Sequence, residues 1–413
     1  MLLLEEFLYQ QVDSILYTYC YLQKNCKQVL ETTTVYIFSL LLTIQDCNMT
    51  TTIPAINEEK LGQFMQKVLY DFGGAASAIL TYIGDKLGLY KAMYDFGKPI
   101  SSQELANVTG TSERYIREWL ANQAAGGYMI YDASTNRYTL PIEQAQALIN
   151  DTSPAYCAGG FQILMAFYKD APKILEAFKT GKGVAWGDHD KDLFEGTERL
   201  FKTGYIANLV NSWIPALNNG NVEKALKKGG LKVADIGCGH GVSTILMAKA
   251  YPNSKFYGFD NHAGSIEYAR NKAKAEGLDE DRIIFKVASS TDFPNVTGDR
   301  YDLITFFDCL HDMGDPEGAA AYALKAIKKP EGTVMIVEGF ANDKVEDNLN
   351  PLGRLSYAAS TMVCIPASLS QNGPALGALA GESRISKVVK SGGFKHFGRI
   401  AQTWFNIVYE AKP

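Results

Sequence analysis

One segment restricts what this chain can fold into more than any other. "LKVADIGCGHGVSTILMAKAY", residues 231–251, reads as a short apolar strand, a turn with three glycines and a helix. Glycine lets a backbone turn sharply and approach a ligand closely, and the amino end of the following helix presents amide groups at the same place. The segment therefore predicts an α/β domain with a ligand at the end of this strand.

The spacing of the glycines favours one kind of ligand. Dinucleotide enzymes favour GxGxxG, whereas the glycines here are Gly237, Gly239 and Gly241. This is GxGxG, and Val242 stands where the third glycine would fall. Asp235 ends the preceding strand. Because a carboxylate and glycine carbonyls repel phosphate but accept hydrogen bonds from an ammonium group, the turn suits a cationic amino-acid ligand better than a pyrophosphate.

The next predicted strand, "SKFYGFD", ends in Asp260. A carboxylate at this position can accept hydrogen bonds from both hydroxyls of a ribose. Taken alone, such a residue is as often a helix cap. Together with the glycine turn, it predicts a ligand that contains a nucleoside.

These motifs resemble those of class I S-adenosylmethionine (SAM)-dependent methyltransferases, and the resemblance covers residues 229–413. Further strands are expected at "RIIFKVA", "YDLITFFD", "GTVMIVEG", "KHFGRIA" and "WFNIVYEAK". The resemblance implies a Rossmann-like sheet of seven strands and SAM as the cofactor. It places Asp235 and the three glycines at the methionine part of SAM and Asp260 at the ribose.

The resemblance also implies the rest of the cofactor site. "ASSTDFP" lies where the family has an acidic residue beside the adenine, followed by an aspartate. Here Ser289 replaces the first acid and is followed by Ser290, whereas Asp292 keeps the second acid. Asp308, at the end of the fourth strand, completes the predicted cofactor-binding residues.

The segment "TFFDCLHDMGD", residues 305–315, passes from an apolar strand into a cysteine, a histidine and acids. A metal site would require several of these side chains to converge, and the segment has no recognised zinc spacing, so we expect no metal. With the following "PEGAAAYALKAIKKPEGTVMIVE" it resembles the LHDWxD segment of winged-helix O-methyltransferases that act on phenolic acids and flavonoids.

That resemblance implies that His311 is the general base, Asp312 its neighbour in the motif and Glu338 the carboxylate that orients it. An imidazole near its ordinary pKa can accept a hydroxyl or thiol proton at neutral pH. Met313 replaces the tryptophan of the family, so the wall of the substrate site differs. The alternative is that His311 only caps the loop and that the enzyme works by proximity.

Residues 49–150 read as a winged-helix domain. Two short helices with predicted N-caps at Ser102 and Ser112 precede "YMIYDASTNRYTL", which alternates around a polar turn as a β-hairpin does. The second helix balances two arginines with two glutamates, so it offers little to the phosphates of DNA. We expect a structural or homodimer-forming module that helps to cover a small-molecule site.

The remaining segments are a connector and an extension. Residues 151–228 read as amphipathic helices, with Trp186, His189 and Phe194 as candidate substrate contacts, although aromatic residues at helix junctions are more often core. Residues 1–48 differ in composition. Their apolar stretch is shorter than the roughly 18 residues of a membrane span and is wrongly placed for a signal peptide. We expect residues 1–48 to be an atypical extension and the functional protein to begin near Met49. The alternative is that these residues form an extra helix that packs on the rest of the protein.

Composition excludes some functions. A formal net charge of -5 gives no general attraction to nucleic acid or to an anionic membrane. The seven cysteines are odd in number and contain no CxxC pair, which favours a reducing, cytoplasmic setting over a disulfide framework.

The sequence therefore predicts a SAM-dependent methyltransferase that acts on the oxygen, sulfur or nitrogen of a small, partly apolar molecule. "YAASTMVCIPASLSQNGPALGALAGE" adds a likeness to a bacterial-type group of winged-helix SAM methyltransferases whose acceptors are largely unassigned. Two alternatives remain: a SAM-binding or DNA-binding regulator without turnover, and an oxidoreductase with a nucleotide cofactor.

Overall fold

The computed structural model describes residues 55–294 and 300–413, so the predicted extension, residues 1–48, lies outside the described residues. The structure divides into two units between Val68 and Leu69. The winged-helix core, the connector and the sheet all lie in the second unit, Leu69–Pro413. Within the described ranges, no helix is both long and apolar enough to cross a membrane.

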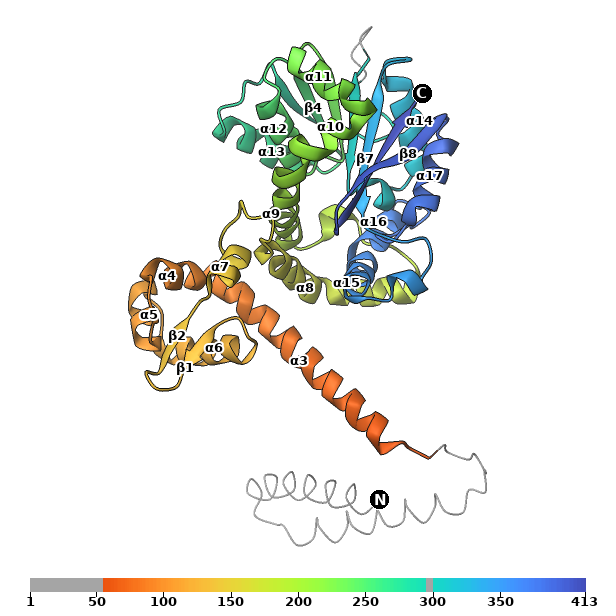
Figure 1. Cartoon of the computed structure of the whole chain (residues 1–413). Helices are drawn as coiled ribbons and strands as arrows, with labels where there is room; N and C mark the ends of the chain where they lie inside the picture. Colours follow the sequence, from red (N-terminus) through yellow and green to blue (C-terminus); the bar gives the residue numbers. More distant parts are fainter. Residues whose placement is uncertain (1–54, 295–299) are drawn as a thin grey trace, which may run out of the picture. The chain divides into compact units, whose positions relative to one another are not determined.

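A seven-stranded sheet forms the centre of the C-terminal half (Figure 1), which confirms the predicted Rossmann-like fold. Its strand order is β5-β4-β3-β6-β7-β9-β8. The first five strands run parallel, and β9 is antiparallel to both of its neighbours. The strands are β3 (Lys232–Ile236), β4 (Lys255–Asp260), β5 (Ile283–Val287), β6 (Leu303–Phe307), β7 (Thr333–Gly339), β8 (His396–Gln402) and β9 (Asn406–Lys412).

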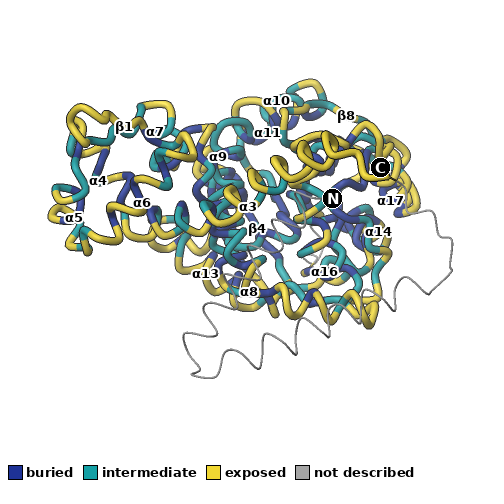
Figure 2. Tube along the Cα trace, turned by 90° about the horizontal axis from the view of Figure 1, so that it is seen from below, coloured by how far each residue is buried: buried dark blue, intermediate teal, exposed yellow. Residues whose placement is uncertain are grey.

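Helices cover both faces of the sheet (Figure 1). One face carries α11 (Asn221–Lys228), α12 (Val242–Ala250) and α13 (Ala263–Ala275), and the other carries α14 (Pro316–Ala326) and α17 (Gly381–Ser391). Parallel strands covered on both sides need apolar residues on both sides, and accordingly every residue of β6 is buried. Figure 2 shows the burial along the chain, with exposed residues on the outer turns of α5 and α13.

The winged-helix prediction is confirmed in its elements. They are α3 (Glu58–Lys86), α4 (Leu89–Phe96), α5 (Ser102–Thr109), α6 (Glu113–Ala125), β1 (Ile130–Asp132) and β2 (Arg137–Thr139). One predicted cap is wrong by one residue: Ser101, not Ser102, caps α5, because the Ser101 hydroxyl accepts from the Glu104 amide while the Glu104 side chain accepts from the Ser101 amide. This reciprocal pair is a capping box.

The remaining elements either connect the winged-helix domain to the sheet or surround the carboxyl edge of the sheet. The label η marks a short 3₁₀- or π-helix. The connector contains α7 (Ile142–Leu148), α8 (Ala158–Thr180), η1 (Trp186–Asp188), α9 (Lys191–Asn208), η2 (Leu209–Trp213), α10 (Ile214–Ala216) and η3 (Leu217–Gly220). Around the sheet edge lie η4 (Leu310–Asp312), η5 (Glu346–Asn348), α15 (Pro351–Ala359), η6 (Ser360–Cys364) and α16 (Ile365–Ser370).

Two glycines allow α8 and α9 to pack closely. A Cβ atom on Gly159 would lie 2.6 Å from the carbonyl oxygen of Gly196 and 2.6 Å from the amide nitrogen of Leu200. A Cβ atom on Gly196 would lie 2.8 Å from the carbonyl oxygen of Gly159. Real side chains do not approach backbone atoms this closely, so the helix crossing depends on both glycines.

This crossing can be tested with two adjacent glycines. Gly159→Ala should lower the free energy of unfolding by about 1–3 kcal/mol, because the helices must move apart to admit a methyl group. Gly160→Ala is the matched control: its Cβ would meet only Leu200 Cδ1, at 3.9 Å. Since alanine favours a helix over glycine, this control should be neutral or gain up to about 1 kcal/mol. Urea unfolding followed by tryptophan fluorescence measures both, and equal stability of the two variants would contradict the packing argument.

Candidate active site

The glycine turn after β3 has the backbone that the sequence predicts. Gly237, Gly239 and Gly241 have φ values of 70°, 51° and 77°, a region that favours glycine. A Cβ atom would lie 2.8 Å from Cys309 Sγ at Gly237 and 2.7 Å from the Phe285 ring at Gly241. At Gly239, no atom lies within 4 Å of that position. The first and third glycines are therefore needed for packing, and the second borders open space.

The amide groups of this turn are bonded within the protein. The amides of Gly237 and Cys238 donate to the carbonyl oxygen of Phe259, at 2.7 and 3.1 Å. The amide of Gly239 donates to Asp260 Oδ2 at 2.9 Å. These N–H groups are occupied, so the turn does not present them to a phosphate as a dinucleotide-binding turn does.

Asp260 ties the turn to the end of β4. Its second oxygen, Oδ1, accepts from the amide of His262 at 2.8 Å. Burial raises the pKa of the Asp260 carboxyl, and the two amide donors oppose this effect. Since each carboxylate oxygen has two lone pairs, both retain the capacity to accept from a ribose hydroxyl.

Asp235 lies beneath the turn and is fully buried. Its Oδ2 accepts from Ser243 Oγ at 2.7 Å and Thr244 Oγ1 at 2.6 Å, and its Oδ1 accepts from Thr305 Oγ1 at 2.9 Å. Burial raises the pKa of this carboxyl to about 6, against the effect of the three hydroxyl donors. Asp235 therefore supports the turn from below through α12 and β6.

The residues expected beside an adenine follow β5 at the same edge of the sheet. Ser289 and Asp292 form a tight turn, in which the Asp292 amide donates to the Ser289 carbonyl at 3.2 Å. Ser290 lies within this turn. The Ala288 amide donates to the Asp260 carbonyl at 2.9 Å, which brings the turn next to Asp260.

His311 and Glu338 form a buried pair. His311 lies in η4 and is 6% exposed, and Glu338 lies near the end of β7 and is 5% exposed. Nδ1 of the imidazole is hydrogen-bonded to Glu338 Oε2. Nε2 lies 3.3 Å from the sulfur of Cys364. A ring that donates from Nδ1 presents Nε2 as the nitrogen that can take up a proton.

Charges around this pair shift its ionisation. Burial alone would lower the pKa of His311, but the charge of Glu338 and hydrogen bonds to Cys364 and Glu338 raise it well above 6.5. Burial, followed by repulsion from Glu338, raises the pKa of Asp308 to about 8. Burial also raises the pKa of Asp312 to about 7, against the attraction of His311.

Asp308 is held in an unusual backbone conformation. Its φ of 49° is rare for a residue with a side chain, and such strain concentrates at functional sites. Asn406 Nδ2 lies 3.2 Å from each of its carboxylate oxygens. No pattern in the sequence identifies Asn406, because it lies on β9 and becomes a neighbour of Asp308 only when the sheet forms.

The other polar residues of the 305–315 segment have structural roles. Cys309 Sγ donates to the carbonyl oxygen of Ile236 at 3.2 Å, and Asp315 Oδ1 accepts from the Gly318 amide at 2.8 Å at the start of α14. Within residues 55–294 and 300–413, no group of three histidine, cysteine, aspartate or glutamate residues is placed to hold a metal ion.

A second group fixes the turn from the connector. Glu198 of α9 accepts from His240 Nδ1 at 2.8 Å and forms an ion pair with Lys272 of α13. The His240 ring stacks on Tyr268, with centroids 4.0 Å apart. No pattern in the sequence predicts this group, since its members come from three separate segments.

Aromatic residues of the connector lie beside the same site. Phe194 contacts both Trp186 and His262, with ring centroids 5.3 and 5.1 Å apart. Trp186 and Phe194 pack with Phe167 and Met362 around the small cluster that includes Cys364. Of the three candidate contacts, His189 differs, because its Nδ1 is bonded to Asp170 at 2.9 Å.

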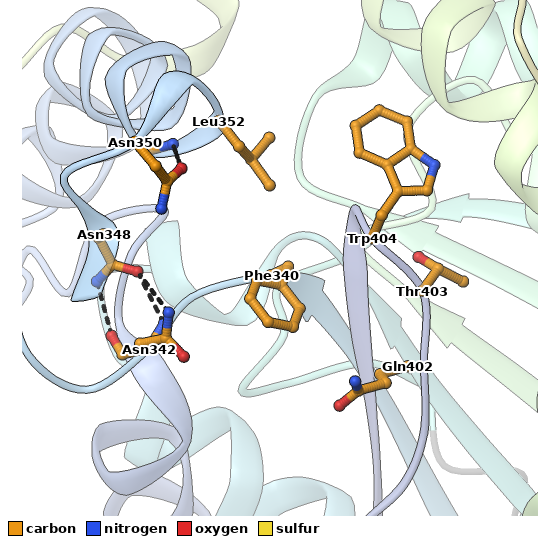
Figure 3. Close-up of a pocket in the computed structure, with 9 residues that line it drawn as sticks. Phe340, Asn342, Asn348, Asn350, Leu352, Gln402, Thr403 and Trp404 are labelled. Carbon is orange, nitrogen blue, oxygen red and sulfur yellow. Dashed lines mark hydrogen bonds between the residues drawn. The ribbon is translucent and has the colours of Figure 1, made fainter.

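A separate cavity of about 450 Å³ opens beyond the end of β7. Figure 3 shows Leu352 and Trp404 on its opposite sides and Phe340 between them. The asparagines that line the cavity already form hydrogen bonds within the protein: Asn342 and Asn348 are bonded to one another, and Asn350 caps α15. None of the predicted site residues lines this cavity.

The ionisation of His311 can be measured directly. In the protein without cofactor, its imidazole resonances should titrate with a midpoint above 6.5, because the Glu338 carboxylate favours the imidazolium. Glu338→Gln removes that charge and should lower the midpoint. The chain has five histidines, so comparison with His311→Asn assigns the signal in an NMR titration. A midpoint that Glu338→Gln leaves unchanged would contradict the coupling.

Two protein families match parts of the chain. The methyltransferase domain family matches residues 227–384, and the Rv2258c-like winged HTH domain family matches residues 75–150. Among curated relatives, an uncharacterised protein of Synechococcus sp. is 34% identical over 103 residues, which are 25% of this chain and 24% of that protein. Ubiquinone biosynthesis O-methyltransferase of Actinobacillus pleuropneumoniae is 33% identical over 109 residues, 25% of this chain and 44% of the relative. The chain thus spans less than half the length of these relatives.

Solved structures share the fold over 82–87% of this chain. An O-methyltransferase family protein from Burkholderia thailandensis has a TM-score of 0.60 at 17% identity, covering 87% of this chain and 98% of that one. Human N-acetylserotonin methyltransferase in complex with SAM has a TM-score of 0.61 at 17% identity, covering 84% and 97%. The O-methyltransferase NcsB1 from neocarzinostatin biosynthesis, in complex with S-adenosylhomocysteine and a dihydroxynaphthoic acid, has a TM-score of 0.54 at 16% identity, covering 82% and 96%. The chain therefore combines a methyltransferase domain of the class I SAM fold with an N-terminal winged-helix domain of the Rv2258c-like type.

Proposed function

We propose that this protein is an enzyme that transfers a methyl group from SAM to the oxygen, sulfur or nitrogen of a small molecule. The observation that carries the proposal is the set of carboxyl groups at the carboxyl edge of the sheet, beside a paired histidine. Asp260, Asp308 and Asp312 lie there with raised pKa values, and Glu338 is bonded to His311. Such a site favours a ligand with positive charge.

The residues of the site fit SAM, which supplies a methyl group on a sulfonium centre when it is bound. Gly239 borders open space, so a ligand can approach its backbone closely. We assign the ribose hydroxyls to Asp260, the methionine part to the glycine turn that Asp235 supports, and the adenine to the turn of Ser289, Ser290 and Asp292. Asp308 lies three residues before His311, and a cationic cofactor beside it would favour its ionised form.

We assign the role of general base to His311. Its Nε2 receives the proton of the acceptor, while Nδ1 remains bonded to Glu338. The carboxylate fixes the orientation of the ring and stabilises the imidazolium that forms. Asp312, next to the base, has the same effect where its carboxyl is ionised, and burial raises the pKa of that carboxyl to about 7.

The neighbours of His311 support a partly apolar acceptor. Phe167, Trp186, Phe194 and Met362 pack around the cluster that contains Cys364, so they offer aromatic and thioether contacts beside Nε2. The neighbour NcsB1 was crystallised with naphthoic acids, which are planar aromatic molecules of this kind. We propose an acceptor with an apolar ring or chain and one ionisable hydroxyl, thiol or amine.

The alternatives from the sequence receive less support. A dinucleotide cofactor would require free amides at the glycine turn, and those of Gly237 and Gly239 are occupied. DNA binding would require free cations, and the winged-helix arginines are paired internally. These ion pairs are Arg114 with Glu118, Arg117 with Glu113 and Arg137 with Glu104.

We propose the domain division that the sequence predicts. It has a winged-helix domain over residues 49–150, a connector over 151–228 and a methyltransferase domain over 229–413. The two family matches support it in outline. A homodimer formed by the winged-helix domain and a reducing, cytoplasmic setting complete the proposal. Among the cysteines that the structure describes, Cys157, Cys238, Cys309 and Cys364 are free thiols, which supports the reducing setting.

Incubation of the purified protein with isotope-labelled SAM and a metabolite extract identifies the acceptor by mass spectrometry. We expect a small molecule that carries the labelled methyl group. SAM that binds but stays intact, with no methylated product, would favour the regulator.

Asp260→Ala should weaken SAM binding, because each charge-assisted hydrogen bond to the ribose contributes roughly 1.5–3 kcal/mol. That is about 10- to 150-fold in affinity for one bond. Glu280→Ala removes an equal charge from an exposed position in the same domain and is the control. Calorimetry measures both. Unchanged affinity in Asp260→Ala, or a preference for NAD over SAM, would refute the assignment.

His311→Ala should leave SAM affinity nearly unchanged and slow turnover by about 10²- to 10⁴-fold, because the acceptor proton has no receiver. Glu338→Gln should cause a smaller loss. Because the neutral imidazole is the active form, turnover should fall as pH drops through the pKa of His311, and Glu338→Gln should move that midpoint to lower pH.

The exposed His396 provides the control, since His396→Ala should keep full turnover. An acceptor that is already ionised, such as an acidic thiol, needs no base, and both His311→Ala and Glu338→Gln would then remain active. That result would remove the general-base role and leave the methyltransferase assignment intact.

A further inference from the structure

Cys364 lies at the reaction site but has no part in the proposed methyl transfer. It ends η6, a π-helical turn in which the Ile365 amide donates to the Ser360 carbonyl. Turns of this kind are rare and often occur at functional sites. The Cys364 sulfur lies 3.3 Å from His311 Nε2, and Nδ1 of the same ring is bonded to Glu338. Thiol, imidazole and carboxylate therefore form one continuous chain.

Two hydrogen bonds hold the segment that carries Cys364 in place. Ser368 Oγ donates to the carbonyl oxygen of Met313 at 2.9 Å, which fixes α16 to the loop that carries His311. The Val184 amide donates to the Pro366 carbonyl at 3.1 Å, which fixes the same segment to the connector. The contact between sulfur and imidazole is therefore part of the packed structure.

The distance of 3.3 Å allows His311 Nε2 and Cys364 Sγ to share one proton. Because Nδ1 donates to Glu338, Nε2 either accepts from the thiol or, when the ring is charged, donates to the sulfur. When the proton rests on Nε2, the sulfur is a thiolate, which is the nucleophilic form of cysteine. The proposed methyl acceptor must present its own proton to the same nitrogen. The thiol thus occupies the place that the acceptor needs.

We propose that Cys364 is a reactive thiol of the acceptor site, which small sulfur electrophiles such as thiosulfonates and disulfides convert to a mixed disulfide. In this reaction the thiol proton passes to His311 Nε2 and Sγ attacks one sulfur of the reagent. A new S–S bond forms, the S–S bond of the reagent breaks, and the leaving group departs with the electron pair. The adduct then covers Nε2 and stops turnover, a consequence that rests on the proposed function.

If the rate of reaction depended on solvent accessibility alone, other cysteines would react before Cys364. Cys364 is 8% exposed, whereas Cys157 and Cys309 are half-buried. Burial raises the pKa of the Cys157 thiol, which slows its reaction. Any path that admits a methyl acceptor to His311 also reaches Cys364. Comparison of Cys364 with Cys157 in one molecule therefore separates the effect of the imidazole from that of exposure.

The test uses the full chain and a limiting amount of methyl methanethiosulfonate, with labelling of each cysteine followed over time by peptide mass spectrometry. Cys364 should react at least about tenfold faster than Cys157. His311→Asn should slow Cys364 by about tenfold or more and leave Cys157 unchanged. Constant labelling of Cys157 also shows that the variant is folded. If His311→Asn does not fold, Glu338→Gln should slow Cys364 by a smaller factor.

The proposal is overturned if Cys364 reacts no faster than Cys157, or if the histidine variant leaves its rate unchanged. With an identified acceptor, turnover should fall in proportion to the labelled fraction of Cys364 and return after treatment with dithiothreitol. A fully labelled enzyme that keeps its turnover would overturn the blocking role. Histidine-dependent labelling in a protein without any methyl transfer would refute the proposed function and leave the reactive thiol standing.

Discussion

The buried carboxylate of Asp235 is the interaction on which the site depends. A charge removed from water is tolerated only where hydrogen bonds replace its hydration, and three hydroxyls do so here. Ser243 and Thr244 begin α12 and Thr305 lies on β6, so one side chain joins the first turn of a helix to two parallel strands. The glycine turn between them therefore follows a fixed path, and its amides reach Phe259 and Asp260 rather than a ligand.

Helix α9 extends this arrangement to the winged-helix domain through two consecutive residues. Glu198 bonds His240 in the glycine turn, whereas Arg199 forms two hydrogen bonds to Asp85 of α3, at 2.7 and 2.8 Å. A helix is stiff over this length, so the position of the winged-helix domain is coupled to that of the glycine turn. This coupling supports the proposed structural role of the domain, as does the internal pairing of its arginines.

The sequence predicted the parts of the fold that are encoded in contiguous residues. The glycine turn, the seven strands and the His311 segment each lie within one short stretch, where spacing and apolar runs determine the local structure. The cap of α5 is an exception, because the sequence does distinguish the two serines: Glu104 lies three residues after Ser101, which is the spacing of a capping box, whereas Leu105 lies three residues after Ser102. The contact between His311 and Cys364 joins residues 53 positions apart, so no spacing rule could have predicted it.

The raised pKa of His311 has to be reconciled with its proposed role as a base. In the resting protein the charge of Glu338 keeps the ring protonated to higher pH, and a protonated imidazole cannot accept a proton. Burial raises the pKa of Asp308 to about 8 and that of Asp312 to about 7, so both carboxyls hold protons near neutral pH. A positive charge beside them would lower the number of protons held by the whole coupled group of carboxyls and imidazole. In its proposed role as a base, His311 thus acts as part of this group and not as an isolated imidazole.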